Sequence, residues 1–294
     1  MKEIVEKAGV LIEALPYIQR FRDAVIVVKY GGSAMEDPAC AAGILLDVAF
    51  MECVGMRPVI VHGGGKAISR GLKKSGIETK FVKGLRVTCE KSIAVVEKVI
   101  KEQVNPGLVS ALVRMGARAE GVNGEEVFEV TRVREKDPGT GAMLDWGFVG
   151  EPHKVHTRRI RDLLKKEIIP VVTPLGMGAD GKIHNVNADT AAAALAGALK
   201  ARKLVFLSDV PGLLRDRNDP SSLIPTLDSG DVGELVRTGV IDGGMLPKVT
   251  SGVEALKAGV RKVHMVDGRM AHSLLLEIFT AKGVGTEIVA NDEN

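Results

Sequence analysis

Two lysines in this sequence stand where a positive charge could act on an anion. Lys29 follows the apolar residues 25–28, which are typical of a buried parallel strand, and glycines 31–32 come one residue later. Lys248 follows Pro247, which is suited to the first position of a helix. Because the helix dipole disfavours a cation in the first turn by about 0.3–1 kcal/mol, an anionic ligand would explain Lys248. Such cations suit phosphoryl transfer, which depends on positioning and charge neutralisation.

Three consecutive glycines, residues 63–65, follow a second strand that we expect at residues 57–62. Glycine lets the backbone approach a ligand closely, and residues 66–75 are expected to form a helix whose first N–H groups point to the same place. This combination predicts a site for a phosphate or a carboxylate. It is not a Walker A motif, because Ala67 stands where that motif needs Ser or Thr.

A polar cluster precedes the alanine-rich helix that we expect at residues 190–201. Asn185, Asn187 and Asp189 occupy alternate positions, so their side chains would lie on one side of a predicted strand. Asp189 is also a natural N-cap for the helix, but capping does not account for the two asparagines. Three polar groups on one side therefore predict a functional site.

Arg86 and Asp209 complete the charged candidates. Arg86 is flanked by apolar residues, so its guanidinium is expected either to hold a substrate carboxylate or to form a structural salt bridge. Asp209 ends the strand expected at residues 203–209, at the same edge of the sheet as Lys29. The sequence shows no nucleophilic Ser or Cys paired with a base and no metal-ligating cluster.

The elements that must position these residues alternate between strand and helix patterns. We expect strands at 25–28, 57–62, 168–173, 203–209, 262–266 and about 286–289, and helices at 38–54, 66–75, 90–116, 153–167, 190–201, 247–256 and 271–282. The helix at 90–116 should divide at residues 105–107, and residues 117–150 are interpreted as hairpins. The order predicts an α/β protein with an open, mostly parallel, doubly wound sheet sandwiched by helices.

Two further segments need a separate interpretation. An apolar stripe at Ile4, Ala8, Leu11, Leu15 and Ile18 predicts an N-terminal helix, which Pro16 should kink or divide, and which is a candidate for subunit contact. Residues 176–181 match the letters of a dinucleotide-binding fingerprint, but the alternating residues 182–186 follow them instead of a helix, so we expect a hairpin turn.

Composition narrows the class of protein. A chain of 294 residues with 45% hydrophobic and 26% charged residues fits a soluble globular protein. The net charge of +3 is too small to favour nucleic acid, and no apolar run is long enough to span a membrane. Cys40, Cys53 and Cys89 lack metal or disulfide spacing and are expected to be free thiols. Since no signal segment is evident, we expect a cytoplasmic protein.

Six blocks of the sequence resemble the N-acetyl-L-glutamate kinases, a family of the amino-acid kinase superfamily, in the order typical of that family. The blocks are Lys-Tyr-Gly-Gly at 29–32, His-Gly-Gly-Gly at 62–65, Gly-Leu-Arg-Val-Thr at 84–88, Asn-Val-Asn-Ala-Asp at 185–189, Ser-Asp-Val-Pro-Gly at 208–212 and Gly-Gly-Met-Leu-Pro-Lys at 243–248. The resemblance runs from residue 25 to residue 289. It implies ATP-dependent phosphorylation of the side-chain carboxylate of N-acetyl-L-glutamate, in arginine biosynthesis, with Mg²⁺ carried by the nucleotide.

The resemblance also implies roles for individual residues. Lys29 and Lys248 would neutralise the transferring phosphoryl group, and Asp189 would orient both lysines. The residues implied in binding the substrate are Gly64, Gly65, Arg86 and Asn185. The residues implied in binding the nucleotide are Gly31, Gly32, Asp209, Gly212, Leu213, Gly243 and Met245. A substrate carboxylate is already ionised near neutral pH, so this reaction needs no general base.

The N-terminal segment, with Ala-Leu-Pro-Tyr-Ile-Gln at 14–19, resembles the arginine-inhibited hexameric members of the family. That resemblance implies a trimer of dimers and an arginine site lined by Tyr17, His264, Glu277 and Gly283. It divides the chain into an N-terminal oligomerisation helix at 1–23, a lobe for acetylglutamate binding and dimerisation at 24–175, and a lobe for ATP and arginine at 176–294.

Two residues depart from the family pattern: Lys66 stands where proline is usual, and Lys83 where asparagine is common. They leave the fine specificity open. An acetylaminoadipate-type kinase of lysine biosynthesis shares most of the blocks, and other kinases of the superfamily, acting on aspartate, glutamate, carbamate or UMP, would lack the segment at 84–88 or carry additional domains. From another class, the chain could be a catalytically inactive arginine sensor, against which Lys29, Asp189 and Lys248 argue.

Overall fold

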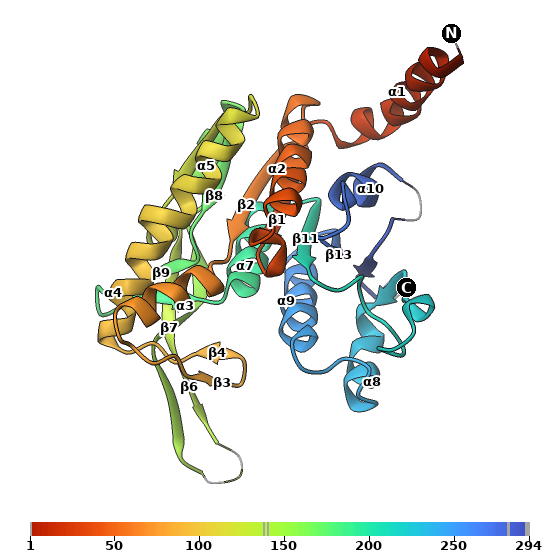
Figure 1. Ribbon diagram of the computed structural model, residues 1–294. Helices are drawn as coiled ribbons and strands as arrows, with labels where there is room; N and C mark the ends of the chain where they lie inside the picture. The colour runs from red at the N-terminus through yellow and green to blue at the C-terminus, as the bar shows by residue number, and fades with distance from the viewer. Residues whose placement is uncertain (1, 138, 140, 281–282, 292–294) are drawn as a thin grey trace.

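An eight-stranded sheet forms the centre of the computed structural model (Figure 1), which describes residues 2–137, 139, 141–280 and 283–291. The strand order is β12-β14-β13-β11-β1-β2-β8-β5, and every neighbouring pair is parallel except β13 and β14. The strands are β1 (Val25–Tyr30), β2 (Arg57–His62), β5 (Ala119–Val122), β8 (Ile169–Val172), β11 (Lys203–Ser208), β12 (Thr226–Asp228), β13 (Lys262–Asp267) and β14 (Thr286–Val289). The predicted open, mostly parallel sheet is confirmed.

The central strands are buried on both faces because helices cover both sides of the sheet. Every residue of β11 is buried, as are all residues of β1 and β2 after the first. The helices are α1 (Lys2–Phe21), α2 (Pro38–Cys53), α3 (Gly65–Lys74), α4 (Glu90–Val99), α5 (Asn105–Arg114), α6 (Arg158–Lys165), α7 (Ala188–Leu199), α8 (Val232–Arg237), α9 (Met245–Lys257) and α10 (Ser273–Phe279). This is the doubly wound arrangement that the alternating sequence pattern predicts.

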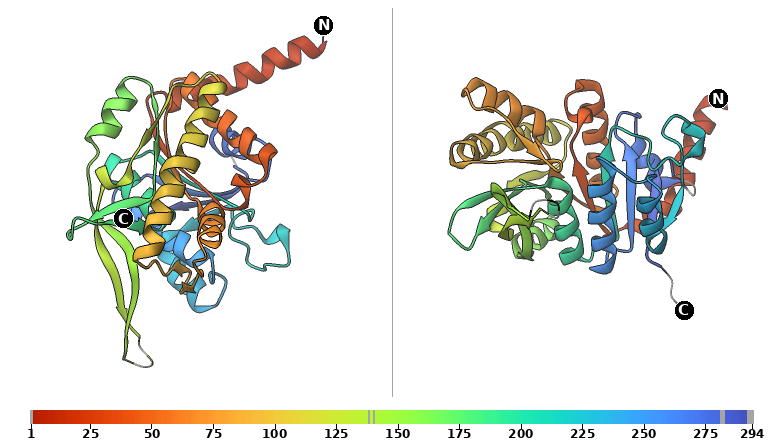
Figure 2. Two further views of the ribbon diagram at one scale, coloured as in Figure 1. Left: turned by 60° about the vertical axis from the view of Figure 1, so that its left-hand side comes forward. Right: turned by 90° about the horizontal axis from the view of Figure 1, so that it is seen from below.

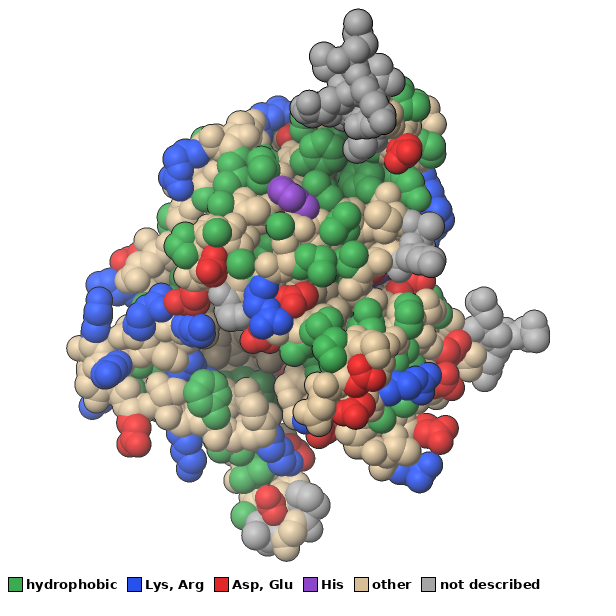
Figure 3. Space-filling model, turned by 45° about the vertical axis from the view of Figure 1, so that its right-hand side comes forward, with side chains coloured by type: hydrophobic (Ala, Val, Ile, Leu, Met, Phe, Trp, Pro, Cys, Tyr) green, Lys and Arg blue, Asp and Glu red, His purple; other side chains and the backbone are tan. Residues whose placement is uncertain are grey.

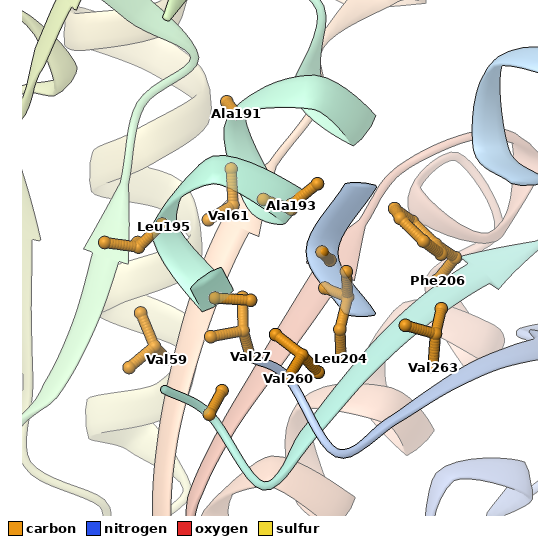
Figure 4. Close-up of a cluster of buried hydrophobic side chains, with 14 of the residues drawn as sticks. Val27, Val59, Val61, Ala191, Ala193, Leu195, Leu204, Phe206, Val260 and Val263 are labelled. Atoms are coloured by element: carbon orange, nitrogen blue, oxygen red, sulfur yellow. The ribbon is translucent and has the colours of Figure 1, made fainter. Parts of the chain in front are cut away.

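Each face of the sheet has its own apolar core. On one face, α6, α7 and α9 cover β1, β2 and β11, and the small side chains of α7 let it pack closely on the strands (Figure 4). Ala191 and Leu195 of α7 lie over Val27, Val61 and their neighbours in that view. On the other face, α2, α5 and α10 pack against the same strands. The two layers hold the carboxyl ends of β1, β2 and β11 in fixed positions.

The region from 117 to 150 differs from the expected set of hairpins. Residues Ala119–Val122 form β5, which pairs in parallel with β8 at the edge of the main sheet. The long hairpin lies further on, between β6 (Phe128–Lys136) and β7 (Met143–Val155), and joins β9 (Leu175–Gly178) and β10 (Ile183–Val186) in a small closed barrel. Strands β9 and β10 are antiparallel, which confirms a hairpin rather than a dinucleotide fingerprint at 176–181.

The N-terminal helix α1 continues through Pro16 as one helix, so the expected division at that residue is wrong. It extends away from the body of the molecule in the left view of Figure 2. Its C-terminal end contacts the body, where the ring of Tyr17 lies 6.2 Å from the ring of Phe279 in α10. Side chains 2–7, 10, 11 and 33 lie outside the described residues, so the predicted apolar stripe is described only at Ala8, Leu15 and Ile18.

Several helix boundaries differ from expectation. The strand β7 continues to Val155, so α6 begins only at Arg158. The helix α9 begins at Met245, which makes Pro247 its third residue rather than its first. The break expected at residues 105–107 lies just before them, where residues 100–104 form a π-helical turn between α4 and α5. Such turns place an extra residue in the helix and are frequent at functional sites.

The strand order reverses next to β1, because the chain fills one side of the sheet through β2 and the other side through β11. Ligands of open α/β sheets bind at such a point, beyond the carboxyl ends of the strands. Lys29 and the glycines that follow β1 and β2 lie there.

Candidate active site

Asp189 connects the two lysines that the sequence singles out. Lys29 Nζ lies 2.9 Å from Asp189 Oδ1, and Lys248 Nζ donates a hydrogen bond of 2.7 Å to Asp189 Oδ2. The three side chains come from the end of β1, the first turn of α7 and the first turn of α9. Residues that are 59 positions or more apart in sequence therefore meet in one ion-paired triad. The Asp189 carboxylate thus offsets the unfavourable interaction of Lys248 with the dipole of α9, for which the sequence predicts an anionic ligand.

The local sequence frees Asp189 for this contact. Asn187, and not Asp189 as expected, caps α7: its side-chain oxygen accepts hydrogen bonds from the backbone N–H groups of Asp189 and Thr190 at 2.8 and 3.2 Å. The Asp189 carboxylate is then left to face the lysines. The prediction of three polar groups pointing into one site is wrong for Asn187, which serves the backbone of the helix.

Burial sets the electrostatics of the triad. It lowers the pKa of Lys29, and Asp189 offsets this only in part. For Asp189, burial alone would raise the pKa, but the charges of Lys29 and Lys248 outweigh it and hold the pKa below its usual range. Asp189 thus stays ionised at neutral pH. Two cations on one carboxylate leave an excess of positive charge beside the glycine loops.

The glycines after β1 and β2 leave room around Lys29. A Cβ atom on Gly31 would lie 2.9 Å from Lys29 Nζ, so a side chain there would displace the ammonium group. Gly32 has φ +77°, a left-handed conformation that glycine favours. Gly64 is the N-cap of α3 and Gly65 its first residue. The N–H groups of Gly64 and Gly65 donate no hydrogen bond within the described residues, as an anion site requires.

Arg86 is buried, with 7% of the residue exposed, and the hydrogen bonds that it donates within the described part of the chain all go to neutral groups. Its guanidinium donates to Gly65 O at 3.0 Å, to Ser69 Oγ at 2.9 Å and to Thr79 Oγ1 at 3.2 Å, and it lies 4.7 Å from the centre of the Phe81 ring. Burial lowers its pKa. The geometry leaves the guanidinium charge available, which favours a carboxylate ligand over a structural salt bridge.

A cavity of about 580 Å³ brings together several of the predicted residues. Gly32, Gly64, Gly65, Arg86 and Asp209 all line it. The cavity and the adjacent triad form what we call the cleft; Gly31 connects the two, since it lies between the Lys29 ammonium and Gly32. Sequence reasoning missed further residues that line the cavity: Met35, Glu36, Ser69 and Arg70. Of these, Ser69 and Arg70 lie about one helical turn after Gly65, where α3 begins, so helical spacing from the glycine triplet could have indicated them.

The other predicted binding residues lie elsewhere. Asn185 is half-buried on β10 and does not line this cavity. Leu213 is buried in the core, and its backbone N–H and C=O are already bonded to Thr286 Oγ1 and the Ile224 N–H. Met245 is half-buried at the start of α9 and packs on the core. The remaining two lie in loops: Gly212 follows β11 and has φ +153°, and Gly243 precedes α9 and has φ +48°.

A second cavity, of about 470 Å³, contains all four residues predicted to line an arginine site. Tyr17, His264, Glu277 and Gly283 come from α1, β13, α10 and the loop after α10. Sequence reasoning missed the charged residues that share this cavity, and these are Arg20, Arg202, Lys203, Arg261, Lys262 and Glu287. The sequence could have indicated two of them, since Lys203 and Lys262 are the first residues of mostly apolar strands.

Three hydrogen bonds hold Glu277 in the second cavity. It is buried and accepts hydrogen bonds from His264 Nδ1 at 2.6 Å and from the backbone N–H groups of Val284 and Gly285 at 2.7 and 3.0 Å. Burial would raise its pKa, but these donors hold it below the usual range. A Cβ atom on Gly283 would lie 2.5 Å from Glu277 Oε2, so only glycine leaves the carboxylate in place.

Within the described residues, no three His, Cys, Asp or Glu side chains are grouped to hold a metal ion. The helices of the described part of the chain include none with the length and apolar character needed to cross a membrane.

Comparison with known proteins places this geometry in a family. The profile of the amino acid kinase family matches residues 24–267. Acetylglutamate kinase from Akkermansia muciniphila is 46% identical over 288 residues, which cover 97% of this chain and 96% of that protein. Acetylglutamate kinase from Heliobacterium modesticaldum is 46% identical over 297 residues, which cover 98% of this chain and 100% of that protein.

Solved structures agree with the fold. N-acetylglutamate synthase from Neisseria gonorrhoeae, complexed with coenzyme A and N-acetyl-glutamate, superposes with a TM-score of 0.80 at 26% identity, covering 96% of this chain but only 63% of the synthase. Carbamate kinase from Giardia lamblia, at 14% identity and a TM-score of 0.65, covers 91% of this chain and 99% of its own and shares the fold alone. The chain therefore belongs to the amino acid kinase family, among the acetylglutamate kinases.

Proposed function

We propose that the protein transfers the γ-phosphoryl group of ATP to the side-chain carboxylate of N-acetyl-L-glutamate. The observation that carries the proposal is the triad: two lysines held at 2.9 and 2.7 Å from one buried carboxylate, beside the N–H groups of Gly64 and Gly65, which donate no hydrogen bond within the described residues. In the mechanism, Lys29 and Lys248 stabilise the negative charge on the transferring phosphoryl oxygens, and the N–H groups of Gly64 and Gly65 donate to the same anion. Asp189 keeps the lysines fixed and stays ionised.

The substrates would approach the triad from two sides. Arg86 would hold the α-carboxylate of N-acetylglutamate, with Asn185 near its acetamido group, and the γ-carboxylate oxygen would attack the phosphorus in line with the leaving oxygen of ADP. Gly32, Asp209 and the segments around Leu213 and Met245 would hold the nucleotide. The attacking carboxylate is ionised near neutral pH, so the reaction needs no general base, and the carboxylate next to Lys29, that of Asp189, is already paired with the two lysines.

Magnesium fits this site as a companion of ATP rather than as a resident metal. Asp189, the buried carboxylate of the triad, is occupied by two lysines, and no group of metal-ligating side chains occurs in the described residues. Mg²⁺ would enter with the nucleotide and supply positive charge to its phosphates.

The test is ATP-dependent formation of an acyl phosphate, trapped with hydroxylamine, from N-acetylglutamate, N-acetylaminoadipate, glutamate and aspartate. We expect turnover with N-acetylglutamate only. Turnover with N-acetylaminoadipate instead would establish the lysine-biosynthesis alternative. Absence of turnover with all four, together with arginine binding, would establish the sensor.

We further propose that arginine binds the second cavity and inhibits the enzyme. Ionised Glu277 suits a guanidinium, and burial lowers the pKa of His264, so its ring is neutral near pH 7. Since its Nδ1–H donates to Glu277, the His264 Nε2 atom is an acceptor; it accepts no hydrogen bond within the described residues, and Glu287 Oε2 lies 3.8 Å from it. The basic residues of the cavity could hold the α-carboxylate. A solved relative of 27% identity, N-acetylglutamate synthase from Neisseria gonorrhoeae, is a complex with coenzyme A and L-arginine.

We also propose that α1 joins dimers into a hexamer in the cytoplasm. The helix extends from the body, and the large exposed apolar side chains include Ile12 and Leu15 on α1, Leu46 and Phe50 on α2, and Leu276 on α10. Hydrophobic side chains gather over the upper part of the face shown in Figure 3. Deletion of residues 1–20 removes Tyr17 from the second cavity, so it should give an active dimer that arginine no longer inhibits. A truncated protein that remained hexameric, or inhibited, would contradict the proposal.

A further inference from the structure

His62, the last residue of β2, has no role in the mechanism above, yet it is fully buried beside the glycine loop. We propose that His62 and Asn105 are positioning residues which turn the Gly63–Gly64 peptide so that the Gly64 N–H points into the cleft. The inference rests on the proposed function, because the N–H group that they orient is one of the donors to the transferring phosphoryl group.

Two hydrogen bonds fix the imidazole of His62. Its Nδ1 atom lies 2.7 Å from Gly63 O, and a carbonyl oxygen can only accept, so Nδ1 carries the proton. The other nitrogen, Nε2, is then an acceptor, and Asn105 Nδ2 donates to it at 3.1 Å. The tautomer and the orientation of the ring follow from these two partners.

The bond to Gly63 O determines where the next N–H points. In a trans peptide the C=O and the N–H lie in one plane and point in opposite directions, and the described chain contains no cis peptide bond. Since His62 holds the Gly63 carbonyl toward the protein interior, the Gly64 N–H is directed to the other side. Gly64 lines the cleft, and its N–H has no partner among the described residues.

Asn105 is itself held from the far side. Its Nδ2 atom also donates to Val171 O of β8 at 2.8 Å. A Cβ atom on Gly121 of β5 would lie 2.2 Å from Asn105 Oδ1, so glycine at position 121 makes room for this amide. Asn105 is the first residue after the π-helical turn at residues 100–104, which brings its side chain toward the sheet. The hydrogen bonds that we call the relay thus run from Val171 O of β8 through Asn105 and His62 to Gly63 O.

The same turn constrains the loop directly. A Cβ atom on Gly64 would lie 2.6 Å from Ile100 Cδ1, the first residue of the π-helical turn. The glycine loop is therefore confined by Ile100 on one side and by His62 on another. Burial also lowers the pKa of His62 to about 4, so the ring stays neutral and keeps the donor at Nδ1 across the working pH range. No charged group takes part in the relay, and His62 would not act as a general acid or base.

The experiment compares three variants of the full chain in the acyl-phosphate assay. His62→Leu removes the donor to Gly63 O, whereas His62→Asn keeps an N–H donor close to the position of Nδ1. His184→Asn is the matched control, because His184 is also buried and bonds one neighbouring carbonyl, Lys182 O, but lies in β10 on the opposite side from Asn185. We expect His62→Leu to lower kcat by about 10- to 100-fold with KM values within about threefold of the parent.

We expect His62→Asn and His184→Asn to keep kcat within about threefold of the parent. Equal losses in His62→Leu and His62→Asn would overturn the proposal, because they would show that the ring only fills space. An unchanged kcat in His62→Leu would also overturn it.

A crystal structure of His62→Leu separates this inference from the proposed function. We expect the Gly63 carbonyl to turn out of its position in His62→Leu and to keep it in His62→Asn. A carbonyl that stays in place in His62→Leu would overturn the inference whatever reaction the enzyme catalyses. Absence of turnover in the parent protein would instead contradict the proposed function.

Discussion

Asp189 in the cleft and Glu277 in the second cavity are both buried carboxylates, with 6% and 5% of the residue exposed, but their partners differ. Asp189 contacts two lysines, so its charge is more than neutralised and the site presents cations. Glu277 is held by two backbone N–H groups and a histidine, which anchor it without cancelling its charge. One acid organises a site for anions, and the other remains available to a cation.

The two regions also contain one buried histidine each, with a similar contrast. His62 bonds to a carbonyl and an amide, and burial lowers its pKa to about 4. His264 bonds to Glu277, which offsets part of the effect of burial on its pKa. A neutral imidazole can therefore orient the backbone at Gly63 in the cleft, whereas in the second cavity it offers Nε2 as a hydrogen-bond acceptor beside Glu277. The partners of a buried group, rather than its residue type, therefore determine its role.

The largest expected effect is on the cleft. Asp189→Asn removes the charge that holds Lys29 and Lys248 together, so the two ammonium groups should separate and kcat should fall on the order of 10³-fold. The measurement is acyl-phosphate formation with N-acetylglutamate and ATP. Arginine binding by the same preparation, measured by calorimetry, reports that the second region is still folded. A kcat within tenfold of the parent would show that Asp189 does not organise the lysines.

The next largest effect is expected on arginine binding, when the charge of Glu277 is removed. Glu277→Gln keeps the shape of the side chain but loses its charge, so the Kd for arginine should rise by about 100-fold, which corresponds to a lost charge-assisted contact of about 2.7 kcal/mol. Calorimetric titration with arginine measures it. Glu234→Gln, an exposed position on α8, is the control. An unchanged Kd in Glu277→Gln would place the arginine site elsewhere.

Arg86 tests how the cleft holds its substrate. Arg86→Lys keeps a positive charge but loses the fork that reaches Gly65 O, Ser69 and Thr79. The KM for N-acetylglutamate should rise by about 50-fold, while the KM for ATP changes little. Steady-state kinetics with each substrate varied in turn separate the two. Equal increases in both KM values would mean that Arg86 supports the loop and does not contact the substrate.

The strands and the cationic site were predictable because their signals are local. Four apolar residues before Lys29 and three glycines after His62 indicate a strand end and a close backbone approach without any tertiary information. The boundaries of the parallel strands follow the same apolar runs. These features are set by short-range chemistry, so the six predicted strands agree with the structure, whereas β5 and β12 of the same sheet were not predicted.

Features that depend on distant partners were not predictable in the same way. Asn187 and Asp189 are both good N-caps, and only Lys29 and Lys248, which are remote in sequence, decide that Asp189 stays free. Asn123-Gly124 resembles a hairpin turn, but the Gly124 N–H donates to Thr173 Oγ1 at 2.7 Å, beyond the end of β8. Pairing over about 50 residues thus overrides the local turn signal.

The smallest expected effect is on the pH dependence of the free energy of unfolding, and it tests whether His62 stays neutral in the folded protein. The folded pKa of His62 is about 4, below the value of about 6.5 for an exposed histidine, so the unfolded chain binds a proton first as the pH falls. The contribution of His62 to stability is complete above pH 6.5 and is lost progressively toward pH 4. Between pH 7.5 and 5 this amounts to about 2 kcal/mol.

Urea unfolding of the parent and of His62→Asn at both pH values isolates the contribution of His62, since other groups titrate alike in the two proteins. Parallel losses of stability in the two proteins would mean that His62 takes up a proton in the folded state, and the neutral relay to Gly63 would then be wrong.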